Sequence, residues 1–292
     1  KVESGTIHGI IGENGAGKST LMSILYGFYQ ADSGTIQVQG QELKINSAND
    51  AIASGIGMVH QHFMLVDTFT VLENVVLGVE SGWTLKASLD DARETLIQLE
   101  KEYHLEVDVD ALIQDLPVGL LQRVEILKAL YRKADILILD EPTGVLTPQE
   151  ADDLFRILEE LSKQGKTVIL ITHKLREIMA ITSHVSVMRN GEMVAHLKTS
   201  ETNREELAEL MVGRKVLLRV DKTSSSPKHE ILRIEHLNVK DPNGVSRVKD
   251  LSFSVHGGEI LGIAGVSGNG QTELLETLTG IRSFQRGSIQ FG

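Results

Sequence analysis

The chain has 292 residues, of which 41% are hydrophobic, and it carries a formal net charge of −11. This composition is that of a globular protein with one large or two ordinary domains, and its acidic balance argues against wrapping nucleic acid, which requires a basic surface. The absence of cysteine excludes disulfides and thiolate metal sites, and the sequence has neither the apolar run of roughly 18 residues of a membrane span nor an export signal.

A glycine-rich segment near the N-terminus has the spacing of a phosphate-binding loop. Residues 12–20 match G-x-x-x-x-G-K-[ST], and apolar residues on both sides predict a strand before the loop and a helix after it. Glycines let backbone N–H groups turn onto phosphate oxygens, Lys18 supplies a positive charge, and Ser19 supplies a hydroxyl for Mg²⁺. The residues predicted to bind nucleotide are Gly12, Asn14, Gly15, Ala16, Gly17, Lys18, Ser19 and Thr20.

Gln61 follows a second strand-like run, in Met-Val-His-Gln-His-Phe. An amide at the end of a strand can bind Mg²⁺ or a water, and the alternative is a surface glutamine. His60 and His62 do not predict a metal site, because the sequence offers no further ligand for them.

The middle of the chain predicts a short strand at 35–38 and an exposed helix at 90–103. Residues 120–132 predict an amphipathic helix. Its apolar stripe consists of Leu120, Val124, Leu127 and Tyr131. The loop at 116–119 leads into this helix, and its backbone N–H groups can bind a second anion.

Two carboxylates follow a run of branched apolar residues at 136–139. Open parallel sheets bind ligands at the carboxyl ends of their strands, so the pair is expected at a site. Asp140 is predicted to hold Mg²⁺ with Ser19, and Glu141 to orient and activate a water. The alternative is that the two residues cap the next helix.

A similar apolar run at 167–171 predicts a neighbouring strand that helices cover on both faces. His173 follows this strand, where it can donate a hydrogen bond to the γ-phosphate. A lone histidine at such a place is more often structural, and the two preceding motifs favour the functional interpretation.

The start of the chain recurs near its end. Residues 5–38 match 258–291 in constant register, so Gly12 corresponds to Gly265 and Lys18 to Gln271. This repeat indicates a duplicated ATP-binding domain.

Two strand-like runs precede the second copy. They lie at 230–239 and 248–255, joined by an Asp-Pro-Asn-Gly turn. The predicted first ATPase domain covers residues 1–214, lacks its first strands and contains a helical subdomain at about 64–133. A serine-rich linker at 215–229 follows it. The predicted second domain, at 230–292, is truncated.

In this order the motifs resemble those of the ATPase subunits of ATP-binding cassette (ABC) transporters. Residues 12–20 are similar to the Walker A loop, Gln61 to the Q-loop glutamine, 116–123 to the signature loop, 136–141 to Walker B, and His173 to the switch histidine. The resemblance implies an α/β fold of the P-loop NTPase type, in which an ABC-type ATPase domain with a helical subdomain is followed by the partial start of a second copy.

The resemblance also implies the cofactors and the site. ATP and Mg²⁺ bind where two domains close head to tail, each nucleotide lying between one Walker A loop and the opposite signature loop. The implied catalytic residues are Glu141, His173 and Gln61, and the implied metal ligands are Ser19, Gln61 and Asp140. The further nucleotide-binding residues are Pro117, Val118 and Gly119 of the signature loop and Gly265, Gly268, Gly270, Gln271 and Thr272 of the second copy.

The partners follow from the same resemblance. Membrane permease subunits would be contacted through the Gln61 loop and the helical region at 64–115, at the cytoplasmic face of the cell membrane. A substrate-binding protein would act indirectly, and nucleic acid is not an expected partner.

Several runs narrow the resemblance to the importers of simple sugars and nucleosides. They are Val-His-Gln-His-Phe-Met-Leu-Val, Val-Leu-Thr-Pro-Gln-Glu, Ile-Thr-His-Lys-Leu-Arg-Glu-Ile-Met and Gly-Val-Ser-Gly-Asn-Gly-Gln-Thr. The branch paired with nucleoside-binding lipoproteins of the basic-membrane-protein type is the most similar. The sequence therefore predicts uptake of a nucleoside or a simple sugar.

Departures from the family pattern predict two unequal sites. Pro117 and Val118 replace the signature serine and a glycine, Thr147 replaces the D-loop aspartate, and Gln271 replaces the second Walker A lysine. In a head-to-tail sandwich, Gln271 and Pro117 fall on the same composite site. We expect that site to be degenerate and the one with Lys18 to be competent. No adenine-stacking aromatic is apparent.

Two other functions stay open from the sequence. A soluble duplicated ABC-type ATPase of translation or DNA repair would show a basic insert or arm. A regulatory module that binds ATP without hydrolysing it is disfavoured by the intact pair of Asp140 and Glu141.

Overall fold

The computed structural model describes residues 1–61, 63–79, 85–214, 228–242, 244–265 and 268–292. The chain divides into two compact units, Lys1–Leu218 and Arg219–Gly292, which are described separately. The predicted linker at 215–229 lies outside the described residues, apart from its last two. The predicted domain boundaries remain predictions.

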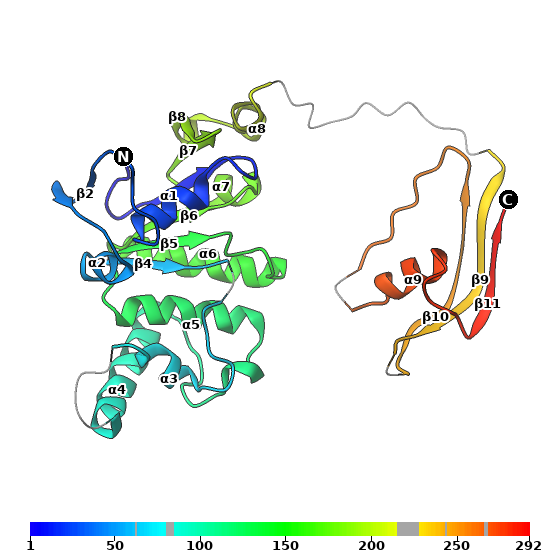
Figure 1. Cartoon of the computed structure of the whole chain (residues 1–292), viewed down its shortest axis with the longest axis horizontal. Helices are drawn as coiled ribbons and strands as arrows, with labels where there is room; N and C mark the ends of the chain where they lie inside the picture. Colours follow the sequence, from blue (N-terminus) through cyan, green and yellow to red (C-terminus); the bar gives the residue numbers. More distant parts are fainter. Residues whose placement is uncertain (62, 80–84, 215–227, 243, 266–267) are drawn as a thin grey trace. The chain divides into compact units, whose positions relative to one another are not determined.

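A six-stranded sheet forms the centre of the first unit, with the strand order β4-β5-β6-β1-β7-β8 (Figure 1). The first five strands in this order run parallel, and β8 is antiparallel to β7. The strands are β1 (Ile7–Ile11), β4 (Ile56–Val59), β5 (Ile136–Asp140), β6 (Thr167–Ile171), β7 (His184–Arg189) and β8 (Glu192–Lys198). The parallel strands predicted at 136–139 and 167–171 are therefore confirmed.

The parallel strands of this sheet are buried on both faces, which explains their continuous apolar sequences. Ile7 and Ile11 of β1 belong to one hydrophobic cluster, whereas Ile10 packs with Met22 in the other. The flanking helices are α1 (Lys18–Leu25), α2 (Ala48–Ala53), α6 (Pro148–Lys163), α7 (Leu175–Ile181) and α8 (Arg204–Val212). Strands buried on both faces lose the apolar–polar alternation of a half-exposed strand.

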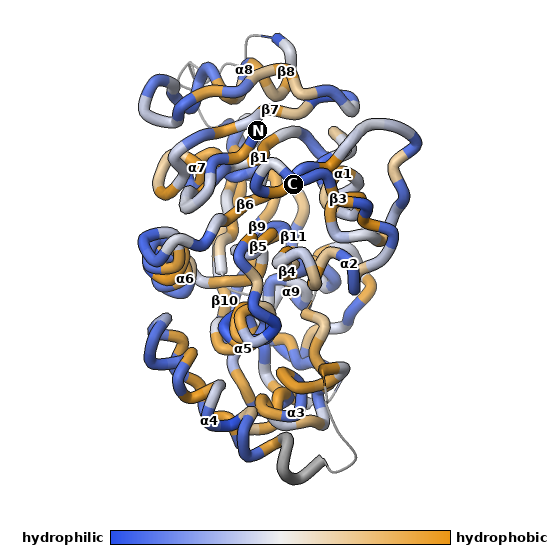
Figure 2. The backbone as a smooth tube through the Cα atoms, turned by 90° about the vertical axis from the view of Figure 1, so that its left-hand side faces the viewer, coloured by the Kyte–Doolittle hydropathy of each residue, from blue (hydrophilic) through white to orange (hydrophobic). Residues whose placement is uncertain are grey.

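Three further helices and a short 3-10 turn make up most of the region predicted as a helical subdomain. They are α3 (Val71–Val76), α4 (Leu85–Tyr103), η1 (Ile113–Asp115) and α5 (Val118–Tyr131). Hydrophobic and hydrophilic segments alternate along α4 in Figure 2, as expected of a helix with one face on a core. Ala92, Leu96 and Tyr103 are its buried hydrophobic residues.

The amphipathic interpretation of α5 is wrong. Val124 and Leu127 of the predicted stripe are buried, but Leu120 and Tyr131 are only half-buried, and Ile126 and other residues off the stripe are buried as well. The reason is that α5 packs against α3 and α4 and also against β4. A helix with partners on several sides needs no single apolar stripe.

A small hairpin, β2 (Ile36–Val38) and β3 (Gln41–Leu43), lies outside the large sheet, and the 3-10 turn η2 (Thr199–Glu201) follows β8.

None of the helices in the described ranges is both long enough and apolar enough to cross a membrane.

The second unit contains a three-stranded antiparallel sheet with the order β10-β9-β11 and one helix. Its elements are β9 (Glu230–Lys240), β10 (Ser246–His256), α9 (Gln271–Leu278) and β11 (Arg286–Phe291). Leu274 of α9 packs with Ile234 and Leu237 of β9, so the helix and the sheet share a core.

Residues 260–264 match β1 in the repeat, but they form no strand, and Ile260 is 95% exposed. In the first unit, β1 is held on both sides by β6 and β7. The described residues of the second unit offer no such neighbours, so the same pattern has no partner for its backbone hydrogen bonds.

Candidate functional site

The glycine-rich loop connects the central strand β1 to α1. Gly17 is the N-cap of α1 with a φ of 98°, a left-handed conformation that favours glycine. Gly12 lies so close to β7 that a Cβ atom there would come within 2.3 Å of the carbonyl oxygen of Met188. The two glycines therefore fix the entry and the exit of the loop, as a backbone cradle for phosphate requires.

Lys18 folds back over this loop. Its Nζ atom donates hydrogen bonds to the carbonyl oxygens of Gly12 at 2.8 Å and Glu13 at 3.0 Å. The residue is 6% exposed, although it carries a charge. A buried ammonium group held only by carbonyl dipoles is ready to accept an anionic partner.

The strand register places the residues predicted to be functional at one edge of the sheet. Asp140 at the end of β5 aligns with Ile171 of β6, which aligns with Ile10 of β1. The residues that follow these three strands are therefore neighbours at the carboxyl edge. The loop at 12–17, both carboxylates and the segment with His173 therefore lie at this same edge.

Asp140 lies next to Ser19 of the phosphate loop. Burial raises the pKa of Asp140 above its usual value, while the neighbouring Ser19 hydroxyl and the charge of Lys18 act in the opposite direction. Two hard oxygen donors at the mouth of a phosphate loop suit Mg²⁺, which prefers carboxylate and hydroxyl oxygens with phosphate.

Glu141 and His173 form the second pair at this edge. Nδ1 of His173 lies 2.8 Å from Oε1 of Glu141, and the histidine side chain is 48% exposed. The backbone N–H of Glu141 donates to the carbonyl oxygen of Ile171 at 2.8 Å, and its φ is 47°. The turn after β5 thus directs the Glu141 carboxylate toward the residue that follows β6.

A buried polar network beneath this pair escaped the sequence analysis. Glu177 of α7 is 6% exposed and accepts hydrogen bonds from the hydroxyls of Thr143 and Thr172. Lys174 bonds both the hydroxyl and the carbonyl oxygen of Thr143 at 3.0 Å. The network ties the turn that carries Glu141 to the loop that carries His173.

We expect Glu177→Ala to destabilise the first unit by about 2–3 kcal/mol, because it leaves buried hydroxyls without their acceptor. The measurement is the urea unfolding midpoint. Glu201→Ala is the matched control, since Glu201 is exposed and pairs only with Lys198 on the surface. Equal midpoints for the two variants would contradict a structural role for the network.

Gln61 lies at the same edge, beyond the end of β4. Its side chain is exposed, and no hydrogen bond joins it to the described residues. His60 packs its ring on Phe28 at 5.6 Å and edge-on to Tyr26 at 6.0 Å. Burial lowers the pKa of His60.

His62 lies outside the described residues. Within the part of the chain that the structure describes, no group of three or more acidic or histidine side chains forms a metal site.

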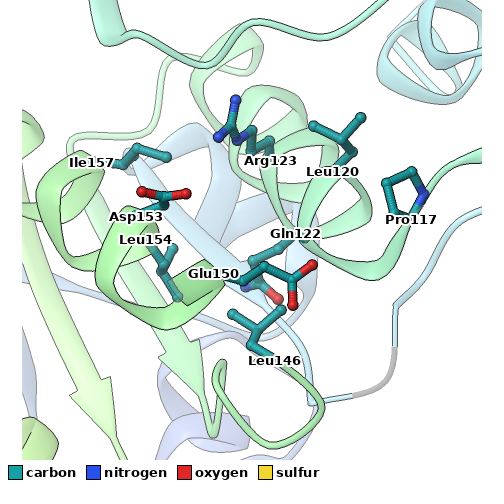
Figure 3. Close-up of a pocket in the computed structure, with 10 residues that line it drawn as sticks. Pro117, Leu120, Gln122, Arg123, Leu146, Glu150, Asp153, Leu154 and Ile157 are labelled. Atoms are coloured by element: carbon teal, nitrogen blue, oxygen red, sulfur yellow. The ribbon is translucent and has the colours of Figure 1, made fainter. Parts of the chain in front are cut away.

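The signature-type residues occupy a different place. Pro117 is the N-cap of α5 and gives it no side-chain capping hydrogen bond. With Gly119 it lines a pocket of about 220 Å³ between α5 and α6 that includes no residue of the glycine-rich loop (Figure 3). Val118 is 37% exposed. Within the first unit this loop is thus separate from the phosphate cradle.

The second glycine-rich loop repeats the local geometry of the first. Gly270 caps α9 with a φ of 94° and ψ of 5°, close to the 98° and 6° of Gly17. Gly268 is also left-handed. A Cβ on Gly265 would lie 2.2 Å from Nε2 of Gln271, so this side chain folds over its loop as Lys18 does. Thr272 follows in the first turn of α9, as Ser19 does in α1.

Comparison with known proteins matches this chain to one family. The ABC transporter family model covers residues 1–144 and 248–292. Nucleoside import ATP-binding protein NupA of Lactococcus lactis subsp. cremoris is 49% identical over 290 residues, which are 99% of this chain and 57% of that protein. Guanosine import ATP-binding protein NupO of Bacillus subtilis is 51% identical over 289 residues, with the same two coverages of 99% and 57%.

The chain therefore spans 57% of the length of these relatives. Among solved structures, the ADP conformation of MJ1267, an ATP-binding cassette of an ABC transporter, is 27% identical with a TM-score of 0.63. The match covers 73% of this chain and 90% of that one. The predicted P-loop NTPase fold is confirmed, and with the family model matching more than half of its residues, the chain belongs to the ABC transporter family.

Proposed function

We propose that this chain is part of the ATP-binding subunit of an importer, in which ATP hydrolysis drives uptake of a nucleoside or a simple sugar through a membrane permease. The observation that carries the proposal is the shared sheet edge, where Lys18, the Ser19–Asp140 pair and the Glu141–His173 pair meet. The relatives NupA and NupO are named for nucleoside and guanosine import, which supports a nucleoside.

The first unit supplies the chemistry in this proposal. Ser19 and Asp140 would hold Mg²⁺, which neutralises phosphate charge when bound. Lys18 exchanges its two carbonyl partners for phosphate oxygens. Glu141 accepts a hydrogen bond from the attacking water, and His173 donates from Nδ1 to Glu141 and so fixes the carboxylate. Gln61 is a further ligand for the metal or for the water.

The second unit supplies a weaker copy of the site. Gln271 keeps the fold of its loop but brings no positive charge to the phosphates, and Pro117 gives α5 neither a hydroxyl nor an N–H group. We therefore assign turnover to the site with Lys18. The loop with Gln271 binds nucleotide without contributing comparable turnover.

A groove beside the Gln61 loop is the surface that we assign to the permease. It has a volume of about 280 Å³, and α5 provides part of its wall. Phe28, which is 50% exposed, and Met64, which is 60% exposed, line it together with His60. The groove also contains the charged residues Glu125, Lys128 and Arg132. Exposed large apolar side chains beside such charges suit a short amphipathic helix of a partner. This contact would hold the chain at the cytoplasmic face of the membrane.

Reconstitution of the full-length protein with its permease and binding protein in vesicles tests the proposal. We expect ATP-dependent uptake of labelled nucleoside or simple sugar. Phe28→Asp should abolish uptake and permease co-purification while ATP binding persists. Tyr29→Asp is the matched control, because Tyr29 is 58% exposed but does not line the groove.

Two outcomes would contradict this function. ATP turnover that neither needs nor contacts a permease would favour the soluble duplicated ATPase of translation or DNA repair. ATP binding with no turnover under any condition would favour the regulatory module. Equal uptake by the Phe28 and Tyr29 variants would contradict only the assignment of the groove to the permease.

A further inference from the structure

The backbone on either side of Gln61 determines where its side chain lies, because the exposed amide makes no hydrogen bond to the described residues. Before Gln61, Val59 ends β4 and pairs with Leu139 of β5. After it, residues 63–66 belong to no strand. The contacts of this following segment therefore decide how firmly the amide is placed.

Two side chains of α5 hold the backbone of Met64. The N–H of Met64 donates to Oε1 of Glu125 at 2.6 Å, and Nζ of Lys128 donates to the carbonyl oxygen of Met64 at 2.8 Å. Glu125 and Lys128 are three residues apart, a spacing that puts both side chains on the same face of a helix. One turn of α5 thus bonds both backbone polar groups of one residue. We call Glu125 and Lys128 the Met64 clamp.

A side chain of α3 repeats this arrangement two residues later. Oδ1 of Asn74 accepts a hydrogen bond from the N–H of Val66 at 2.7 Å, and Nδ2 of Asn74 donates to the carbonyl oxygen of Val66 at 3.1 Å. Asn74 is fully buried, and Leu65 packs against the hydrophobic core. In a β-strand, the N–H and C=O groups of every second residue bond to one neighbouring strand. Here side chains of two helices bond Met64 and Val66 instead.

The carboxylate of the clamp is buried, since Glu125 is 3% exposed. Burial raises the pKa of Glu125, while the charge of Lys128 and the hydrogen bond from Met64 act in the opposite direction. Burying a carboxylate costs free energy, and an apolar residue of similar volume often packs at such a position without this cost. Stability alone therefore does not explain the carboxylate, whereas a bond to the Met64 N–H requires an acceptor.

We propose that Glu125 and Lys128 are positioning residues for ATP hydrolysis, which hold the backbone after Gln61 so that its amide meets the metal or the attacking water. The inference rests on the proposed function, in which Gln61 has that role. Met64 follows Gln61 by three residues, and a fully extended chain of that length spans about 11 Å at most. Fixing Met64 therefore confines the amide to the region next to the end of β4.

The clamp should affect the chemical step more than the binding of ATP. Its side chains bond the Met64 backbone, whereas the phosphates in our proposal are bound by the loop at 12–17 and Lys18. An interaction that acts only in the transition state changes kcat and not the affinity for substrate. Gln61→Ala removes the amide itself, so loss of the clamp should have no further effect in that background.

Two variants of Glu125 separate the hydrogen bond from the charge. Glu125→Ala removes the acceptor for the Met64 N–H, whereas Glu125→Gln keeps an acceptor oxygen of the same reach. Each is made in the full-length protein and again together with Gln61→Ala. Turnover is measured without the permease, because the clamp also lines the groove assigned to that partner. Gln164→Ala is the matched control, since Gln164 also donates to a backbone carbonyl oxygen, that of Glu102 on α4.

We expect Glu125→Ala to lower kcat about tenfold, as is typical of residues that orient a ligand of a metal, with the KM for ATP within about twofold of the parent value. Glu125→Gln should retain most of the turnover, and Gln164→Ala should match the parent. In the Gln61→Ala background, Glu125→Ala should cause no further loss. Thermal unfolding checks the fold of each variant.

Lys128→Met replaces Glu125→Ala if the alanine variant has a lowered melting temperature. Lys128 is only half-buried, and methionine keeps much of its length without the donor to the Met64 carbonyl oxygen. It should lower kcat by a smaller factor, and this loss should again be absent together with Gln61→Ala. Lys101→Met, at an exposed position of α4, is its control.

Three results would overturn the inference about the clamp. They are parental turnover in Glu125→Ala or in Gln61→Ala, an equal loss in Glu125→Gln, and a loss that persists in full together with Gln61→Ala. Each would leave the importer function intact, because the parent protein still hydrolyses ATP. Absence of turnover in the parent protein, with and without the permease, would instead overturn the proposed function itself.

Discussion

Glu141→Gln should reduce the ATP turnover of the full-length protein by about 10²–10⁴-fold while its affinity for ATP is retained. Glutamine has the size of glutamate but cannot accept a proton from the attacking water. The Mg²⁺ ligands Ser19 and Asp140 and the phosphate ligand Lys18 remain in place, so binding should persist. Steady-state phosphate release and labelled-ATP binding measure the two quantities.

The contact between His173 and Glu141 adds a prediction about the double variant. Because Nδ1 of His173 lies 2.8 Å from Glu141 Oε1, the two residues should act as a unit. His173→Ala should lower turnover in the native protein, yet add little to Glu141→Gln, since effects within one catalytic unit are not additive. Asp152→Asn, on the exposed surface of α6, is the control. Fully additive losses would contradict the paired arrangement.

Lys18→Ala and Gln271→Ala should have very different effects. Lys18 is the buried cation of the first loop, and a hydrogen bond to a charged group contributes about 1.5–3 kcal/mol. Its loss should weaken ATP binding to that loop by about 10- to 100-fold and abolish most turnover. Gln271→Ala removes a neutral amide and should leave at least half of the turnover.

The measurement is turnover of the full-length protein, with ATP binding followed in parallel. Gln271→Lys is the informative third variant, because it restores a charge to the second loop without altering the first. Comparable losses of turnover from Lys18→Ala and Gln271→Ala would contradict the assignment of one competent site and one degenerate site.

Local sequence patterns predicted the parts of the site that lie on consecutive residues. The glycine spacing located the phosphate loop, and the run before Asp140 located the strand that carries the carboxylates. The alignment of these segments at one edge followed from a general rule for parallel sheets. The sequence assigned a function to His173 only together with the other motifs. The reason is that Glu141, which His173 contacts, follows a different strand.

Tertiary contacts account for what the sequence did not reveal. Glu177 lies 34 residues from Thr143, its hydrogen-bond partner, and no short motif links them. Glu125 lies in a predicted helix by sequence, and only the fold brings its carboxylate to the N–H of Met64. The amphipathic interpretation of α5 failed for a related reason, because that helix has packing partners on several sides.

Glu141 has a backbone conformation that its side chain does not favour. A φ of 47° lies in the left-handed region, where a non-glycine residue costs roughly 1–2 kcal/mol. Glycine would adopt this turn without strain but would carry no carboxylate. The hydrogen bond from the Glu141 N–H to Ile171 and the buried network around Glu177 are what hold the turn in place. The proposed catalytic residue thus stores strain that the rest of the fold must offset, so the most stable sequence at this position would not be an active one.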